Sequence, residues 1–290
     1  MTKSDNGEEE APVQDPSFPG TAQATVALRA RTTRLLRQYG PPVGLIILVF
    51  TAWQVGTWLM QVPKWLLPSP WEIIVAGAGA LTLLGPHTWQ TLQETWLGLG
   101  LSLVVGLGLA LLIDFSATLR RTLYPLLVAS QTVPILALAP LLIIWFGYGM
   151  LPKVVVVALV CFFPIVVSTA DGLRVADPDL IALLRAMGAN RRQIFLKVRL
   201  PGALPSFFSG LKIAITYSVV GAVIGEWVGA SKGLGIFMIR SSKNFLTDRV
   251  FAAIAVTSLL SIIMFAAVMV LERTLLPWYY AYREEAWEEI

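Results

Sequence analysis

Residues 250–271 read VFAAIAVTSLLSIIMFAAVMVL, an apolar run without a single charged side chain. As a helix, such a run crosses the hydrocarbon core of a bilayer, which is about 30 Å thick, and satisfies its own backbone hydrogen bonds there. The rest of the chain has the same character, because 56% of its 290 residues are hydrophobic and only 14% are charged. A soluble globular domain has about 25% charged residues. The composition therefore predicts an all-α polytopic membrane protein.

Apolar runs of similar length predict six transmembrane helices. An even number of crossings places both termini on one side of the membrane. Arginines precede the first run, and the positive-inside rule puts that side in the cytoplasm. We therefore expect a multi-pass cell-membrane protein with cytoplasmic N- and C-termini. The six runs are Val43–Met60, Leu92–Ile113, Leu123–Phe146, Leu151–Ala170, Ser206–Gly229 and Val250–Leu271.

The ends of the chain differ from its apolar middle. Residues 1–38 begin with an acidic stretch that contains Pro and Gly but no signal-peptide core, and they end in a cluster of arginines. This composition predicts a disordered and then basic cytoplasmic tail. We expect the six-helix transmembrane domain to cover residues 39–277 and a cytoplasmic C-terminal tail to cover residues 278–290.

A short additional helix is predicted between the first two runs. Ser69-Pro70-Trp71-Glu72 combines a capping serine, a first-turn proline and a glutamate three residues after the serine. An apolar stretch follows and is expected to stop at Gly85-Pro86. A helix of about 15 residues is too short to span a bilayer. We expect it to lie at the outer face, with a re-entrant or buried segment as the alternative.

The residue inventory excludes several kinds of chemistry. Cys161 is the only cysteine and His87 the only histidine, so the chain can form neither an internal disulfide nor a clustered His/Cys metal site. No GxxxxGK(S/T) phosphate loop occurs, and no serine or cysteine nucleophile stands beside a histidine in the sequence. We therefore expect a protein that is not an enzyme and that binds neither a cofactor nor nucleic acid.

A long cytoplasmic segment, residues 171–205, separates the fourth and fifth runs. Asp177 is a capping residue followed by a first-turn proline, and Gly188 suits the left-handed position that ends a helix. Asn190 and Gln193 then have the spacing of a second capping box. Two short helices are thus predicted to meet at Gly188.

The second of these helices is expected to end before Leu200-Pro201, because a proline disfavours helix at the preceding residue. The resulting hairpin would carry an apolar rim of Leu184, Met187 and Ile194. Such a shape can dock into a groove of another protein. A hairpin that lies on lipid headgroups through its arginines is the alternative.

The spacing in this segment resembles that of a known family. Gly188 is followed, after nine residues, by Val198-Arg199-Leu200-Pro201. This is similar to the cytoplasmic EAA loop (EAA, three residues, G, nine residues, I-x-L-P) of permease subunits of type I ATP-binding-cassette (ABC) importers. The chain departs from the family at Ala182-Leu183-Leu184, where the family has Glu-Ala-Ala, and at Val198, where the family has isoleucine.

Further phrases resemble the nitrate, sulfonate and taurine branch of these permeases, closest to members that import thiamine pyrimidine precursors or riboflavin. They are LPSP at 67–70, TVPILALAPLLIIWFGYG at 132–149 and GAVIGEWVGASKGLG at 221–235. The resemblance extends over residues 40–277. It implies the six-helix fold of a type I importer permease, with a coupling helix in the cytoplasmic loop.

The resemblance also implies protein partners, in addition to the lipid of the membrane. Two ABC ATPase subunits would bind ATP and Mg²⁺ and receive the coupling helix, a second permease copy would complete a homodimer, and an extracytoplasmic substrate-binding protein would deliver the solute. Alternating access would move a small organic solute: a heteroaromatic vitamin or precursor first, then an alkyl sulfonate, taurine or nitrate. The residues implied in ATPase coupling are Leu184, Arg185, Ala186, Met187, Gly188, Ala189, Asn190, Leu200 and Pro201.

The third, fourth and fifth spans are expected to surround the translocation pathway, with the first and sixth outside it. Pro134 and Pro140 interrupt the third run and free backbone carbonyls at membrane depth. Glu226 is an ionisable residue inside the fifth run and hence a functional candidate, although a helix-end pairing with Lys232 is the alternative. The candidate pathway residues are Gln131, Pro134, Trp145, Tyr217 and Glu226.

Other features of the runs have simpler interpretations. Glu94 and Asp114 lie near the ends of the second run and are interpreted as boundary residues. Aromatic residues near the outer ends of the third and fifth runs form either an interfacial belt or a stacking site for a flat ligand. Small residues at steps of four, including Gly98, Gly106 and Gly221, favour close helix packing over a substrate groove.

Two other function classes stay open at this point. A secondary transporter or channel that acts without an ATPase is the alternative function, although the sequence has no matched halves of the kind such transporters show. A membrane-embedded enzyme is the third, and the spans lack an acid–base constellation to support it.

Overall fold

The computed structural model describes residues 21–280, with side chains from residue 40 onward, and the chain divides after Met60 into two units. The first unit contributes one helix, α1 (Thr21–Leu59), whose residues 40–59 are long and apolar enough to cross a membrane. The first predicted span is thus helical, and so is the backbone of residues 21–38, which the sequence assigned to the tail. The extreme ends of both predicted tails lie outside the described residues.

The second unit begins with the predicted short helix, α2 (Pro70–Gly79). Ser69 Oγ accepts a hydrogen bond from the Glu72 N–H (3.3 Å), and Glu72 Oε2 accepts one from the Ser69 N–H (2.8 Å), so the capping box is confirmed. The predicted stop at Gly85-Pro86 is wrong, because the next helix, α3 (Leu81–Phe115), runs through it. Pro86 lies in the second turn of α3, where its missing N–H removes one hydrogen bond near the helix start.

The third predicted span is not a single kinked helix. It consists of α4 (Ala117–Ser130) and α5 (Ile135–Phe146), which are bent by 98° relative to each other. Pro134 has an extended backbone (φ −66°, ψ 117°) and disfavours helix at the residue before it, so the two helices separate there. If this bent pair is one crossing, the described residues supply up to six helical membrane crossings, and otherwise five.

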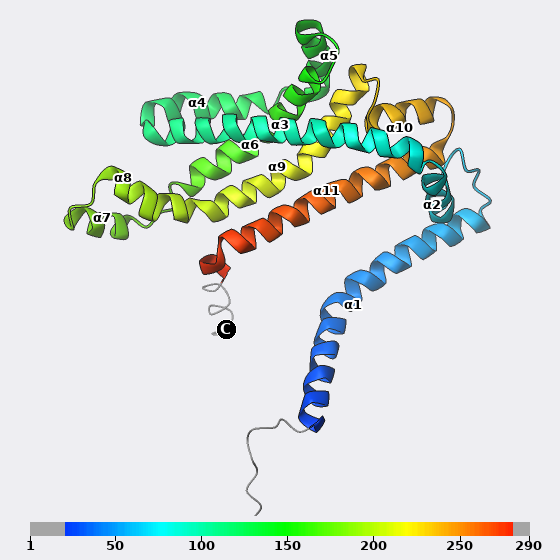
Figure 1. Ribbon diagram of the computed structural model, residues 1–290, viewed down its shortest axis with the longest axis horizontal. Coiled ribbons are helices and arrows are strands. Elements are labelled where there is room, and N and C mark those ends of the chain that lie inside the picture. The colour runs from blue at the N-terminus through cyan, green and yellow to red at the C-terminus, as the bar shows by residue number, and fades with distance from the viewer. Residues whose placement is uncertain (1–20, 281–290) are drawn as a thin grey trace, which may run out of the picture. The chain divides into compact units, whose positions relative to one another are not determined.

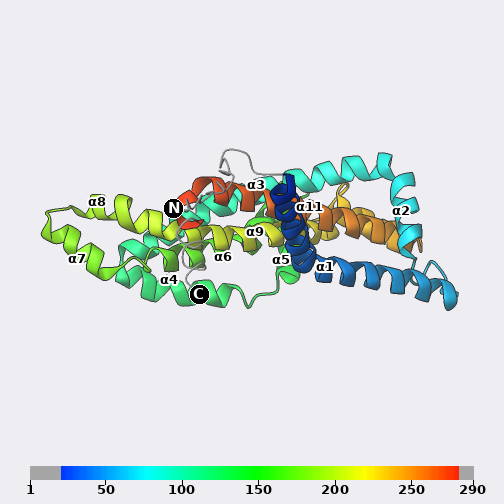
Figure 2. The same cartoon turned by 90° about the horizontal axis from the view of Figure 1, so that it is seen from below.

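The core of the second unit is formed by α6 (Leu151–Gly172) and α9 (Leu200–Gly229), which pack against each other and against α3 (Figures 1 and 2). Val157 and Ile165 of α6 are buried in this core. A Cβ added at Gly98 would overlap Val157, and one at Gly106 would lie 2.9 Å from Ile165 Cγ2. The small residues of α3 therefore allow close helix approach, as predicted.

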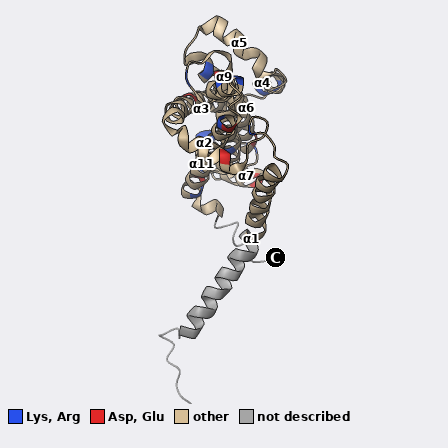
Figure 3. Ribbon diagram, turned by 90° about the vertical axis from the view of Figure 1, so that its right-hand side faces the viewer, with Lys and Arg blue, Asp and Glu red and all other residues tan. Residues whose placement is uncertain are grey.

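Two further helices, α10 (Leu234–Lys243) and α11 (Thr247–Leu275), complete the unit. α11 packs against α9, α10 and α2. Lys212 of α9 and Glu272 of α11 form an ion pair of 2.8 Å between the two helices. The side of α11 away from its neighbours exposes large apolar residues such as Ile263, and charged residues are sparse along the described helices (Figure 3).

Between α6 and α9, the chain forms α7 (Pro178–Ala186) and α8 (Arg191–Ile194), which lie at one end of the unit in both views (Figures 1 and 2). A π-helical turn, Phe195–Arg199, leads from α8 directly into α9. The helix end expected before Leu200-Pro201 is therefore wrong. In the wider turn the Leu200 N–H bonds the Phe195 carbonyl, so the helical path continues although Pro201 has no N–H to donate.

Candidate functional site

The long segment between α6 and α9 folds into a capped helical hairpin. Asp177 Oδ1 accepts the Asp179 N–H (2.9 Å) at the start of α7, and Gly188 has a φ of +83° after its end. The Ala189 N–H donates to the Leu184 carbonyl (2.9 Å), a bond that a left-handed glycine makes possible at a helix C-terminus. Nothing lies within 4 Å of a Cβ added at Gly188. Backbone conformation, and not lack of space, favours glycine there.

A second capping box begins α8. The Gln193 N–H donates to Asn190 Oδ1, and the Asn190 N–H donates to Gln193 Oε1, both at 2.8 Å. The two predicted helix starts and the glycine turn are confirmed. Because all these bonds are local, the sequence of the hairpin itself fixes its shape.

The surface of the hairpin differs in part from the predicted rim. Met187 is 74% exposed and Leu183 is 57% exposed, whereas Ile194 is buried. Ile194 therefore does not belong to an exposed rim. Leu180, Leu183 and Met187 form the exposed apolar surface of the hairpin, which we call the apolar tip. Among the other predicted coupling residues, the exposed ones are Arg185, Ala186, Gly188 and Asn190, and the half-buried ones are Leu184 and Ala189.

Arg199 ties the base of the hairpin to two other helices. Its Nη1 and Nη2 donate to the two carboxylate oxygens of Asp114 at 2.9 and 2.6 Å. Its Nε and Nη2 also donate to the Leu173 carbonyl, just after α6, at 3.1 and 2.9 Å. The interpretation of Asp114 as a mere boundary residue is wrong, because its carboxylate forms a bidentate ion pair. Leu200 and Pro201 follow this anchor in the first turn of α9, so α8 and the π-helical turn separate them from α7.

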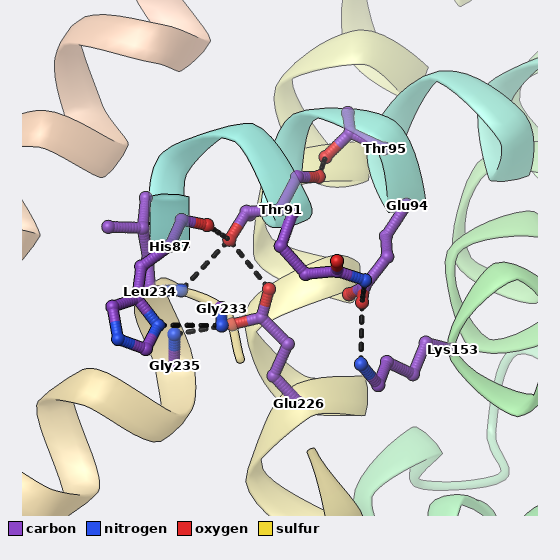
Figure 4. A network of polar contacts seen from close by, with 10 residues as sticks. His87, Thr91, Glu94, Thr95, Lys153, Glu226, Gly233, Leu234 and Gly235 are labelled. Carbon is purple, nitrogen blue, oxygen red and sulfur yellow. Dashed lines mark hydrogen bonds and ion pairs between the residues drawn. The ribbon is translucent and has the colours of Figure 1, made fainter. Parts of the chain in front are cut away.

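Glu226 lies fully buried in a polar network near the opposite end of the unit (Figure 4). Its two carboxylate oxygens accept hydrogen bonds from the Thr91 hydroxyl (2.6 Å) and from the Gly235 N–H (2.5 Å). The predicted pairing with Lys232 is wrong. Lys232 is exposed, and the carboxylate of Glu226 has internal donors on both oxygens.

The same network caps α10, whose N-cap residue, Gly233, has no side chain to do so. The Leu234 N–H donates to Thr91 Oγ1 (2.9 Å), and the Gly233 N–H donates to His87 Nδ1 (2.8 Å). The Gly235 N–H bonds the carboxylate of Glu226 in α9, as described above. The N–H groups of residues 233, 234 and 235 are therefore all bonded to side chains of other helices. A helix cannot satisfy its first N–H groups by itself. The network therefore fixes the start of α10 to α3 and α9.

Lys153 and Glu94 form a buried ion pair beside this network. Lys153 Nζ lies 2.5 Å from Glu94 Oε1, which also accepts a hydrogen bond from Gln90 Nε2 (2.8 Å). The two charged side chains are 9% and 0% exposed. Glu94 is therefore not a boundary residue, contrary to the sequence-based interpretation, and the pair joins α3 to α6. The second carboxylate oxygen of Glu94, Oε2, is buried without a hydrogen-bond partner among the described residues.

The predicted pathway residues differ in their burial. Gln131 and Pro134 are exposed at the break between α4 and α5. Trp145, near the end of α5, is 66% exposed, and Tyr217, in the middle of α9, is 52% exposed. Glu226, by contrast, is enclosed. Four of the five predicted pathway residues thus lie on the surface of the single chain. None of these four belongs to the polar network around Glu226.

A cavity of about 510 Å³ lies between the loop after α5 and the loop after α9. Its lining includes Tyr148, Lys153, Gly229 and Arg240. It therefore combines an aromatic ring with Arg240 and with Lys153, which is a member of the buried ion pair. Within the part of the chain that the structure describes, no three His, Cys, Asp or Glu side chains are grouped so that they could hold a metal ion.

The residues that sequence reasoning missed are His87, Thr91 and Lys153. For Lys153 the sequence does offer an indication, because a charged residue inside an apolar run indicates a partner within the membrane domain. Nothing in the sequence identifies Glu94 as that partner, since the two are 59 positions apart. For His87 and Thr91 the sequence offers no comparable signal.

Comparison with known proteins gives a family match over most of the second unit. Residues 102–276 match the family model described as "Binding-protein-dependent transport system inner membrane component". The matched region begins within α3, ends at the end of α11, and includes the hairpin and its Arg199 anchor.

Individual relatives cover most of the chain. The formylaminopyrimidine transport permease protein ThiX of Halalkalibacterium halodurans is 42% identical, over 82% of this chain and 95% of the relative. The riboflavin transport system permease protein RibX of Chloroflexus aurantiacus is 35% identical, over 86% of this chain and 94% of the relative. An inward-facing structure of the MetNI methionine ABC transporter has a TM-score of 0.60 at 24% identity, over 68% of this chain and 97% of the matched chain. That structure shows a shared fold.

Proposed function

Because the chain belongs to the family of binding-protein-dependent transport system inner membrane components, we propose that it imports a heteroaromatic vitamin or vitamin precursor. The chain is a multi-pass inner-membrane permease of an ABC importer for small solutes, and not an enzyme. Such a permease works with an ATPase and with a substrate-binding protein. ATP and Mg²⁺ belong to the ATPase subunits, two per complex.

The coupling contact is the α7–α8 hairpin, and its apolar tip docks into a groove of the ATPase. The observation that carries this assignment is the combination of an exposed tip with a rigid base. Leu183 and Met187 are exposed although they are large and apolar, which is typical of a docking surface. Arg199 connects the base to Asp114 and the Leu173 carbonyl. A displacement of the tip is thereby transmitted to α3, α6 and α9 together.

The translocation pathway lies between two copies of the chain, which form a homodimer. Tyr217 is exposed in the middle of α9, at a depth where lipid would offer its hydroxyl group no partner. A second copy facing this side would close a path lined by α9 and α5 of each chain. This arrangement accounts for the exposure of Trp145 and Gln131 on the single chain.

A heteroaromatic solute is favoured by both the relatives and the aromatic residues. Two of the relatives are named as transport permeases for formylaminopyrimidine and for riboflavin, which are both heteroaromatic. Trp145, Tyr148, Tyr217 and Trp227 are all exposed, and aromatic rings of this kind stack with flat ligands. An alkyl sulfonate, taurine or nitrate is the second choice.

The termini lie in the cytoplasm, as the arginines before the first span favour.

Uptake by proteoliposomes tests this function. The vesicles hold the chain with its ATPase subunits and its binding protein, and labelled formylaminopyrimidine, riboflavin and taurine are supplied separately, with ATP or a non-hydrolysable analogue inside. We expect ATP-dependent uptake of a heteroaromatic solute and none of taurine. Uptake of taurine alone would contradict the solute class. Equal flux through the chain without ATPase subunits would contradict ATP-driven import and favour a secondary transporter or channel.

A further inference from the structure

A basic cavity of about 560 Å³ lies where the end of α3, the start of α4 and the end of α6 meet. Its polar lining consists of Asp114, Arg120, Arg121, Tyr124, Arg174 and Arg199. The lining includes no residue of α7 or α8. A partner docked on the apolar tip therefore does not have to occupy this cavity.

The charges in this cavity do not balance. Asp114 is the one acidic residue in the lining, and Arg199 engages both of its oxygens. Arg120, Arg121 and Arg174 form no ion pair with a carboxylate in the described part of the chain. The cavity thus presents three arginines whose charge no neighbouring side chain neutralises. Like charges that line one cavity repel one another, and a bound anion would relieve that repulsion.

The donors in the cavity suit a phosphate group. A guanidinium presents paired N–H groups that match phosphate oxygens, and it binds them with two parallel hydrogen bonds. The Tyr124 hydroxyl is a further donor in the lining. Next to the cavity along the chain, Phe115 at the end of α3 is 76% exposed and Leu119 of α4 is 40% exposed. Phosphate-binding groups beside exposed apolar side chains match a lipid headgroup with its acyl chains.

We propose that this cavity binds the phosphate group of an anionic phospholipid, at the corner between α3 and α4. A soluble phosphate ester shares the same recognition chemistry. The bound phosphate bridges Arg120 and Arg121 of α4 to Arg174 after α6. It thereby holds α4 against the helices that carry the hairpin. The site does not depend on the identity of the transported solute or on ATPase docking.

Lipid binding to the purified full-length chain in neutral detergent tests the proposal. Native mass spectrometry measures the retention of phosphatidylglycerol, with phosphatidylcholine as the zwitterionic comparison. The test variant is Arg120→Gln/Arg121→Gln/Arg174→Gln. The matched control is Lys232→Gln/Arg240→Gln/Lys243→Gln, which removes the same charge from exposed positions near α10. A third variant, with the three cavity arginines changed to lysine, keeps the charge and checks that the cavity folds.

We expect the wild type and the control to bind phosphatidylglycerol at least about tenfold more tightly than phosphatidylcholine. The glutamine variant should lose this preference, and the lysine variant should retain part of it. Competition by millimolar glycerol phosphate or inorganic phosphate would support the site with a water-borne phosphate as ligand, and its absence would support the lipid. An unchanged preference in the glutamine variant, or an equal loss in the control, would overturn the proposal. Because the assay uses neither ATPase nor solute, its outcome is independent of the proposed transport function.

Discussion

The ammonium group of Lys153 lies 2.5 Å from the carboxylate of Glu94, and this ion pair joins α6 to α3 inside the helix bundle. Both side chains are removed from solvent. A buried charge costs several kcal/mol unless a partner compensates it. The two residues are therefore expected to behave as a unit.

Breaking this pair should destabilise the protein more than removing both members. We expect Lys153→Met to lower the free energy of unfolding by about 3–5 kcal/mol, because Glu94 then stays buried without a counterion. The double variant Lys153→Met/Glu94→Leu should recover most of that loss. Unfolding in detergent measures both, with Lys243→Met at an exposed position as control. Losses that simply add in the double variant would show that the two residues act independently.

Thr91→Val should loosen the start of α10. Valine has the same shape but leaves the Leu234 N–H without its acceptor and Glu226 without one of its donors, at a cost of about 1–3 kcal/mol. Amide hydrogen exchange should become faster in α10. The control is Thr88→Val, because among the described residues the Thr88 hydroxyl bonds only the Leu84 carbonyl of its own helix (2.8 Å). Equal exchange in the two variants would rule out a capping role for Thr91.

Bulky substitutions on the hairpin should disrupt the contact through which the permease stimulates ATP hydrolysis. Ala186→Trp and Met187→Trp enlarge two exposed positions, the last residue of α7 and the residue directly after it, so we expect membrane insertion to stay normal. ATPase activity stimulated by the solute-loaded binding protein should fall at least about tenfold, as in other interfaces where a central contact is disrupted. Val175→Trp, at a position 76% exposed outside α7, is the matched control. Wild-type stimulation in both hairpin variants would place the docking surface elsewhere.

Arg199→Lys should weaken coupling although it keeps the charge. A lysine cannot form the paired bonds to Asp114 and the bond to the Leu173 carbonyl at the same time. We expect transport to fall while assembly with the ATPase is retained, as measured by co-purification. Lys197→Arg, at an exposed position in the same turn, should have no effect. Normal transport by Arg199→Lys would mean that the anchor is not needed for coupling.

Cysteine labelling can locate the pathway. In a Cys161→Ser background, cysteines at Gln131 and Tyr217 should react with a water-soluble thiol reagent, and the reactivity should change between nucleotide-free and ATP-trapped complexes. A cysteine at Ile263, which is 57% exposed on the apolar side of α11 that we assign to lipid, should stay unreactive, because lipid offers no water to support a thiolate. A cysteine at Glu226 should react only if the network around α10 opens. Labelling at Ile263 that matches Tyr217 would contradict the assigned pathway.

The features that the sequence predicts best are local ones. The helix starts at Ser69, Asp177 and Asn190, and the left-handed turn at Gly188, each depend on a few neighbouring residues, so pattern and structure agree. The errors also have local causes. The prolines at 86 and 201 were interpreted as helix stops, but one lies near a helix start and the other follows a π-helical turn, so neither ends its helix.

The polar contacts between helices were not predictable in this way. The separation from Asp114 to Arg199 is 85 positions, and from Thr91 to Glu226 it is 135. Periodicity shows that such residues interrupt an apolar run, but it does not show which helix supplies the partner. That choice depends on the packing of α3, α6 and α9. The break between α4 and α5 falls at Pro134, but the proline pattern alone does not give its angle of 98°.

The start of α10 is capped by side chains of α3 and α9, and this has a consequence for the order in which the helices fold during synthesis. His87 and Thr91 leave the ribosome more than a hundred residues before the N–H groups they bind, which are 146 and 143 positions further along. A helix of ten residues is marginal in isolation. We therefore expect α10, which lies between the last two spans, to fold only after α9 has packed against α3. Its protection from protease during synthesis would mark the moment at which the helix bundle has closed.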